Sequence, residues 1–206
     1  MLKKKTRQIM FFQLGYYDGK FDGIWGKKSK VATKRFQQEY GLKVDSIYGP
    51  NTEKKLKKVY KNFMNEEVTE DDFQNTKYFT KREISCNDNC GYDRISKQLL
   101  YNIYALRYYM NEKMNITSAC RCEKHNKKVG GRKTSRHFNY EKFTKAIDFS
   151  NKKTKSLSYR KKITNFWINY IPNARYSYSN GYGKIGKKDK KVIAKNMGSS
   201  VHIDVK

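Results

Sequence analysis

The sequence predicts an all-α module of three helices followed by an α+β domain with a small antiparallel sheet. Two observations predict this order in the chain of 206 residues. The N-terminal third repeats a turn that leads into a helix, whereas the C-terminal half holds short segments of alternating apolar and polar residues, as strands do. An acidic segment lies between the two. We therefore expect one domain over residues 1–62, a linker over 63–78 and a second domain over 79–206.

The N-terminal third contains an internal repeat. Residues 22–29 (DGIWGKKS) are matched by residues 45–52 (DSIYGPNT) further along the chain. Each copy sets an Asp-containing turn before an aromatic residue, a glycine and a hydroxyl group, so each should lead the chain into a helix. Ser29 and Thr52, or Asn51, are then expected to cap the first turn of those helices.

Apolar periodicity predicts where the three helices run. One apolar stripe within residues 32–40 stops before Gly41, a second covers residues 56–60, and a third covers residues 9–14 and stops at Gly15. A module of about 60 residues can fold alone, although with a small margin of stability.

The rest of the chain mixes one long helix with strands. Residues 61–78 are acidic and lack periodicity, which is typical of a linker. Apolar residues between Ile95 and Met110 mark one face of a long helix. Segments 116–120, 146–149 and 201–205 are expected to be strands, and the last of them alternates most clearly.

The charge of the chain favours a polyanionic partner. Lys and Arg number 46 against 19 Asp and Glu, which gives a formal net charge of +27. Nucleic acid, an anionic cell wall or an acidic membrane surface would each suit that charge, and an AT-rich coding sequence would also produce it without selection. Aromatic residues make up 15% of the chain, which argues against a disordered basic tail. No segment approaches the ~18 apolar residues of a membrane span, so we expect no membrane insertion.

Two histidines and one aspartate suit a metal site. His137 follows a Ser-Arg pair, Asp148 lies on the predicted strand 146–149, and His202 lies on 201–205. Two imidazoles and one carboxylate are the three protein ligands that a catalytic zinc needs, with the fourth position left to water. Isolated residues of these types are otherwise surface groups or parts of capped turns. Strand alternation lets Asp148 point into a cleft while its neighbours enter the core.

Four short blocks surround these residues. They are 117–131 (TSACRCEKHNKKVGG), 135–137 (SRH), 145–148 (KAID) and 201–204 (VHID). In this order they resemble the zinc peptidases of the D-alanyl-D-alanine carboxypeptidase family, also called hedgehog-like.

The resemblance implies roles for individual residues. It implies zinc bound by His137, Asp148 and His202. It also implies that Arg121 holds a substrate carboxylate or a developing oxyanion, which suits the forked donors of a guanidinium, with a solvated surface charge as the alternative. Ser135 is expected to orient substrate or a ligand, and the alternative is a serine that only forms a turn.

Two departures from the family pattern matter. The segment between the first histidine and the Lys-Ala-Ile-Asp block is longer than usual, since residues 138–143 intervene and Thr144 takes the place of a glycine. Several branches of the family carry an acidic residue three positions before the last histidine, where this chain has Ser199. Asp204 is therefore our candidate for the catalytic general base, or for a partner that orients an imidazole.

The N-terminal third has its own resemblance. Segments 14–19 (LGYYDG), 22–26 (DGIWG) and 49–52 (GPNT) resemble the peptidoglycan-binding domain found at one end of many wall hydrolases. With the peptidase blocks they make the chain similar to a phage endolysin. That similarity implies a bacteriolytic enzyme whose partner is peptidoglycan, and we expect the protein to be a monomer. We expect it to be made in the bacterial cytoplasm without a signal peptide and released to the wall with a holin's help.

The four cysteines leave several interpretations open. Cys86 and Cys90 are separated by three residues, and Cys120 and Cys122 by one, so neither pair has the spacing of a zinc ribbon. Reduced, partly buried thiols are the expectation, with a disulfide after export or a structural zinc as alternatives. His125 is expected at the surface.

The sequence therefore predicts a zinc-dependent hydrolase of peptidoglycan peptides. The bond cleaved stays open between D-Ala-D-Ala, L-Ala-D-Glu and a cross-bridge. A non-catalytic basic protein that binds wall or nucleic acid is the alternative, although no motif for specific nucleic-acid binding is present. A related peptidase with another substrate, or an inactive enzyme, is a third.

Overall fold

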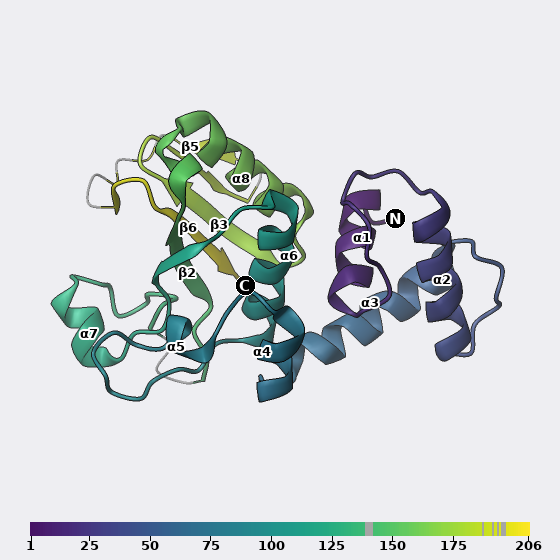
Figure 1. Ribbon diagram of the computed structural model, residues 1–206, viewed down its shortest axis with the longest axis horizontal. Coiled ribbons are helices and arrows are strands. Elements are labelled where there is room, and N and C mark those ends of the chain that lie inside the picture. Colours follow the sequence, from purple (N-terminus) through teal and green to yellow (C-terminus); the bar gives the residue numbers. More distant parts are fainter. Residues whose placement is uncertain (139–141, 187, 191, 193, 195–196) are drawn as a thin grey trace. The chain divides into compact units, whose positions relative to one another are not determined.

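The computed structural model describes residues 1–138, 142–186, 188–190, 192, 194 and 197–206. The chain divides into two compact units, Met1–Glu66 and Glu67–Lys206 (Figure 1). Within the described residues no helix is long and apolar enough to cross a membrane.

The first unit is the predicted three-helix module. Its helices are α1 (Lys4–Gln13), α2 (Lys27–Glu39) and α3 (Pro50–Asn65). They enclose a small core rich in aromatic rings, in which Phe11 packs edge-on against Phe36 and Tyr48 at centroid distances of 5.5 and 6.0 Å. The core is held by ring packing because a unit of this size has little aliphatic surface to bury.

A buried glutamine holds each copy of the repeated turn. The Gln8 amide nitrogen donates to Asp22 Oδ1 at 2.9 Å and to the Ile24 carbonyl at 3.0 Å, while the Gly23 N–H donates to Gln8 Oε1 at 2.9 Å. The second turn repeats this pattern with the same three distances. Its residues are Gln37, Asp45, Ile47 and Ser46. The repeat seen in the sequence is therefore a repeated hydrogen-bond network.

The predicted helix caps are wrong. The residues before α2 and α3 are Gly26 and Gly49, and no side chain caps either helix. Ser29 and Thr52 lie within the helices and are buried. The Thr52 hydroxyl accepts a hydrogen bond from the Gln37 amide at 3.2 Å. These hydroxyls therefore pack beneath the turns, where each glutamine organises the loop.

The acidic segment is not an irregular linker throughout. Residues 61–65 continue α3, and α4 (Glu70–Thr76) begins with a capping box formed by Thr69 and Asp72. Asp72 is buried, accepts a hydrogen bond from Tyr101 Oη at 2.8 Å and pairs with Lys97 at 3.3 Å. Because these partners lie on α6 (Lys97–Met110), the acidic helix is part of the second unit.

The second unit is an α+β domain built on one antiparallel sheet, as predicted. Its six strands lie in the order β1-β2-β6-β3-β4-β5. Their bounds are β1 (Asn115–Ser118), β2 (Ala146–Ser150), β3 (Ala174–Ser179), β4 (Tyr182–Ile185), β5 (Lys188–Lys190) and β6 (Val201–Val205). The three predicted strands correspond to β1, β2 and β6, which are neighbours in the sheet.

Helices cover one face of this sheet and leave the other to the site. The long α6 and α8 (Leu157–Tyr170) pack against the central strands (Figure 1). Thr164 on α8 bonds to Ser177 on β3 at 2.9 Å, and Trp167 Nε1 donates to the Asp204 carbonyl at 3.1 Å. Ser177 pairs in register with Ile203, so Ile203 faces the helices and His202 faces the opposite side. The remaining elements are α5 (Lys81–Ile84), α7 (Glu123–Lys128) and η1 (Lys152–Lys155).

Candidate metal centre

Strand register brings two of the three predicted ligands together. Asp148 on β2 and His202 on β6 are direct cross-strand partners, so their side chains project from the same face of the sheet. His202 Nδ1 lies 2.8 Å from Asp148 Oδ1. Since this pairing is part of the sheet hydrogen-bond ladder, the two side chains are held together by the backbone itself.

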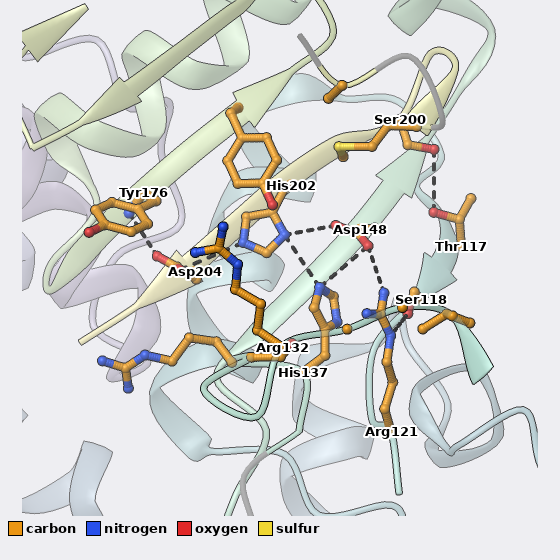
Figure 2. A pocket seen from close by; sticks show the side chains of 18 of the residues that line it. Thr117, Ser118, Arg121, Arg132, His137, Asp148, Tyr176, Ser200, His202 and Asp204 are labelled. Carbon is orange, nitrogen blue, oxygen red and sulfur yellow. Dashed lines mark hydrogen bonds and ion pairs between the residues drawn. The ribbon is translucent and has the colours of Figure 1, made fainter. Parts of the chain in front are cut away.

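The third ligand, His137, comes from a loop that is fixed from two sides. Its carbonyl accepts hydrogen bonds from the Arg121 N–H at 3.1 Å and the Thr144 hydroxyl at 3.0 Å. Its ring is only 4% exposed and points toward the sheet, where Nε2 lies 3.3 Å from Asp148 Oδ2 and 3.3 Å from His202 Nδ1 (Figure 2). The three side chains therefore converge from segments far apart in the sequence.

The donor atoms fit a zinc ion. One ligand atom from each of His137, Asp148 and His202 can be chosen so that all lie within 4.8 Å of one another. His137 Nδ1 lies 2.9 Å from the Ala119 carbonyl, which can only accept, so the proton sits on Nδ1 and the Nε2 lone pair is left for a metal. Two imidazole nitrogens and a carboxylate are a donor set that suits zinc.

The electrostatics keep the carboxylate charged. Burial opposes ionisation of Asp148, but hydrogen bonds with His137 and His202 outweigh it and hold the pKa of its carboxyl below the ordinary value. Burial lowers the pKa of His137, so this imidazole favours the neutral form that a metal requires. For His202, burial is outweighed by hydrogen bonds to Asp148 and Asp204, which raise the pKa to about 9. Asp148 thus balances the positive charge of the His202 ring.

Asp204 lies behind His202, where its oxygens already have partners. Its Oδ2 is 3.6 Å from His202 Nε2 and accepts from Arg175 Nη2 at 2.7 Å, and its Oδ1 accepts from the Tyr176 N–H at 2.7 Å. The residue is 1% exposed. This geometry suits a carboxylate that orients an imidazole ring more than one that takes a proton from water.

Arg121 and Ser135 both line the cavity beside the candidate ligands. Arg121 donates from Nε to Ser118 Oγ at 2.9 Å and from Nη2 to Asp148 Oδ2 at 3.2 Å. Ser135 lies in the turn before His137, where its carbonyl accepts from the Phe138 N–H at 3.1 Å. The cavity has a volume of about 960 Å³. Both predicted residues are therefore within the site, and the turn explains the position of the serine.

Further cavity residues come from β3, a strand that the sequence analysis missed. Tyr178 pairs in register with His202, and the two rings stack at 4.4 Å. Tyr176 and Arg175 also line the cavity. The signal was weak alternation in ARYSYS, residues 174–179, which no apolar run accompanies. The sequence also predicts a longer loop at residues 138–143. Three of its residues, 139–141, lie outside the described residues.

His125 is not a simple surface residue. It is half-buried, and its Nδ1 lies 3.3 Å from Cys86 Sγ. Cys86 is 39 positions away in the chain, so no local pattern in the sequence indicates this contact.

Comparison with known proteins assigns both units. Residues 5–56 match a peptidoglycan binding domain, and residues 77–167 match Peptidase M15. The second match includes His137 and Asp148 and ends before His202.

Several curated proteins match parts of the chain. The zinc D-Ala-D-Ala carboxypeptidase of Streptomyces albus G is 30% identical over 126 residues, which cover 56% of this chain and 46% of that protein. The spore cortex-lytic enzyme of Oceanobacillus iheyensis is 40% identical over 57 residues, covering 28% and 20%. The N-acetylmuramoyl-L-alanine amidase CwlM of Mycobacterium tuberculosis is 41% identical over 51 residues, covering 25% and 13%. The chain spans less than half the length of each. It carries a peptidoglycan-binding domain followed by a peptidase M15 domain.

Proposed function

We propose that the protein is a zinc-dependent peptidase that hydrolyses peptide bonds of peptidoglycan, with its first unit bound to the cell wall. The observation that carries the proposal is the convergence of His137, Asp148 and His202 at the wall of an open cavity. This convergence occurs in the unit that contains the match to Peptidase M15, in a chain that is also similar to a zinc carboxypeptidase.

His137, Asp148 and His202 would hold the zinc ion. When bound, zinc supplies Lewis-acid chemistry, which polarises a carbonyl group and makes water a stronger nucleophile near neutral pH. The protein's share of the work is to hold the ligands ready. The Ala119 carbonyl fixes the tautomer of His137, and the β2–β6 ladder fixes the separation of the other two.

Asp204 acts as a positioning residue in this proposal. It faces the Nε2 side of His202, while the Nδ1 side faces Asp148. Arg175 and the Tyr176 N–H hold its carboxylate in that orientation. Asp148 and Asp204 are the two carboxylates among the described residues that line the cavity. The base role expected for Asp204 therefore stays as the competing assignment.

The cavity suits a peptide that carries carboxylates. Four arginines line it: Arg121, Arg132, Arg136 and Arg175. Arg121 lies nearest to the candidate ligands, through its contact with Asp148, and a guanidinium there can hold a substrate carboxylate or a developing oxyanion. Peptidoglycan stem peptides carry such carboxylates. We therefore propose a stem peptide or cross-bridge as the substrate, with Ser135 helping to orient it from the adjacent turn.

The first unit would keep the enzyme on its substrate. Since the wall is an immobile polymer, a bound module raises the effective concentration of the catalytic unit at each bond. The formal charge of +27 would strengthen binding to an anionic wall at low salt. Wall binding should therefore weaken as salt rises.

We extend the proposal to a phage or prophage endolysin, because a wall-binding domain joined to a peptidase is the organisation expected of one. Expression of the chain in a bacterial host with and without a co-expressed holin tests this setting. Lysis that depends on the holin supports it, and lysis at the same rate in its absence contradicts it.

Digestion of purified peptidoglycan tests the enzymatic proposal. The zinc-loaded protein should release peptide fragments, and mass spectrometry of the new termini identifies the bond. His137→Ala should release none. Binding to wall without fragments from the zinc-loaded protein would favour a non-catalytic binding protein, and tight, salt-sensitive binding to DNA would favour a nucleic-acid partner.

A further inference from the structure

A second cluster of metal-ligating side chains lies outside the site described above. Cys86, Cys90 and Cys122 bring their sulfur atoms within 4.8 Å of one another. The His125 Nδ1 atom lies 3.3 Å from Cys86 Sγ, so a nitrogen donor lies beside the three sulfurs. We propose that these four residues bind a structural zinc ion.

The number and type of donors fit zinc. Structural zinc sites are closed and tetrahedral, and three cysteines with one histidine are one of their common donor sets. Zn–S bonds of about 2.3 Å set the sulfur atoms of such a site roughly 3.8 Å apart. Sulfurs that already lie within 4.8 Å of one another therefore need only small side-chain shifts to reach that geometry.

The backbone around the cluster is shaped to bring the donors together. The Cys86 N–H donates to the Tyr92 carbonyl at 2.8 Å, which closes a loop that contains Cys90. Asn89 and Gly91 have positive φ angles of 52° and 74°, so the chain reverses sharply within that loop. Cys86 and Cys90 thus come from a tight loop, whereas Cys122 and His125 come from the start of α7.

Two backbone donors point at the sulfur atoms. The Cys122 N–H lies 3.4 Å from Cys86 Sγ, and the His125 N–H lies 3.4 Å from Cys122 Sγ. Donors of this kind stabilise negative charge on sulfur, and the thiolate is the form that binds metal. The backbone therefore favours the thiolate form of both Cys86 and Cys122.

A disulfide accounts for the cluster less well. A disulfide would join two of the sulfurs and leave the third sulfur and the imidazole without a role. A zinc ion uses all four donors at once.

The proposed zinc would join the loop before α6 to the segment that carries Arg121. Arg121 directly precedes Cys122, and its N–H donates to the His137 carbonyl at 3.1 Å. The ion would thus stabilise the backbone that presents both Arg121 and His137. This last consequence rests on the proposed function, whereas zinc binding by the cysteines does not.

Metal content of the full-length protein tests the proposal. The protein is purified anaerobically, without chelator or reductant, and its zinc is counted by mass spectrometry. We expect two zinc ions per chain in the wild type and one in Cys90→Ser. Cys90 is exposed, so its substitution spares the core, and circular dichroism verifies the fold. Cys120→Ala is the matched control, because Cys120 lies outside the cluster, and it should keep two.

Cobalt substitution separates the two metal sites. Thiolate ligands give a sulfur-to-cobalt charge-transfer band in the near ultraviolet, which nitrogen and oxygen ligands do not give. The band should persist in His137→Ala and disappear in Cys90→Ser. The two proposals can also fail separately. If His137→Ala shows the charge-transfer band but the zinc-loaded wild type does not cleave peptidoglycan, this inference stands and the proposed function is overturned.

Three results would overturn the inference. The first is a wild type that holds one zinc ion, lost in His137→Ala. The second is a full zinc content in Cys90→Ser. The third is a disulfide between any two of Cys86, Cys90 and Cys122 in the anaerobically purified protein, seen as two thiols that resist alkylation.

Discussion

Gln37 in the first unit and His137 in the second are both almost fully buried, with exposed fractions of 2% and 4%. The Gln37 side chain meets a complementary set of turn groups within 15 residues, and these use both ends of its amide. The Nε2 atom of His137 instead meets Asp148 and His202, which are themselves potential ligands. A buried polar group paired with complementary partners serves the fold, whereas a buried convergence of potential ligand atoms indicates a metal site.

Removal of a candidate ligand should have the largest effect. We expect His137→Ala to lower peptidoglycan hydrolysis on the order of 10³-fold or more, because the reacting groups act as a unit. Wall binding by the first unit should be unchanged. Rates of fragment release and sedimentation with purified wall measure the two properties. Hydrolysis by His137→Ala at the wild-type rate would show that His137, like Gln37, serves only the fold.

Removal of a buried glutamine should damage stability and not chemistry. Gln37→Ala leaves several turn groups without a partner, so we expect the first unit to lose about 2–3 kcal/mol of unfolding free energy. Gln38→Ala is the matched control, since the neighbouring Gln38 is exposed. Denaturant unfolding measures both variants. Equal stabilities would show that the glutamine network contributes little.

Asp204 lies between the two kinds of group, because it is satisfied by partners and also contacts a candidate ligand. If it positions His202, Asp204→Asn should weaken zinc affinity about 10- to 100-fold, and added zinc should restore part of the activity. If it is the general base, turnover should be abolished while zinc stays bound. Zinc titration and kcat at saturating zinc separate the two roles. Near-normal activity with normal zinc affinity would contradict both.

Asp72 should give the smallest effect. Burial opposes its ionisation, but hydrogen bonds from Thr69 and Tyr101 and the charge of Lys97 hold the pKa of its carboxyl below the ordinary 3.8. Its stabilising contribution is therefore complete above about pH 5, where the carboxyl is ionised in the unfolded chain too, and is lost as the pH falls through the lowered pKa. A single proton gives at most about 1.4 kcal/mol per pH unit.

Unfolding free energies between pH 5 and pH 2.5 measure this contribution. Asp72→Asn should flatten the pH dependence, whereas the neighbouring Asp71→Asn, at an exposed position, should leave it as in the wild type. Equal pH dependence in the two variants would contradict the assignment.

The sequence predicts those helices and strands whose residues show a regular spacing of apolar side chains. The helices of the first unit follow from apolar spacing, and β6 follows from the alternation of Val201–Val205. The helix Glu70–Thr76 was missed because acidic residues dominate it, although Thr69 and Asp72 have the spacing of a capping box. A hydroxyl near a helix start usually caps it, which is why the sequence predicts Ser29 and Thr52 as caps, but here buried glutamines organise the turns instead.

The site was predictable in its ligands and not in its surroundings. His137, Asp148 and His202 lie in sequence blocks that resemble a known family, so their convergence could be expected. Tyr178 reaches His202 through the β3–β6 register, which only the folded sheet determines. The contact of His125 with Cys86 likewise depends on the path of two loops that are distant in sequence.

A crystal structure with anomalous diffraction data at the zinc edge tests whether the three side chains bind a metal ion. We expect an anomalous peak bonded to His137 Nε2, a carboxylate oxygen of Asp148 and His202 Nδ1, with the fourth side open to the cavity. No peak at these atoms in crystals grown with zinc, or side chains turned away from one another, would contradict it.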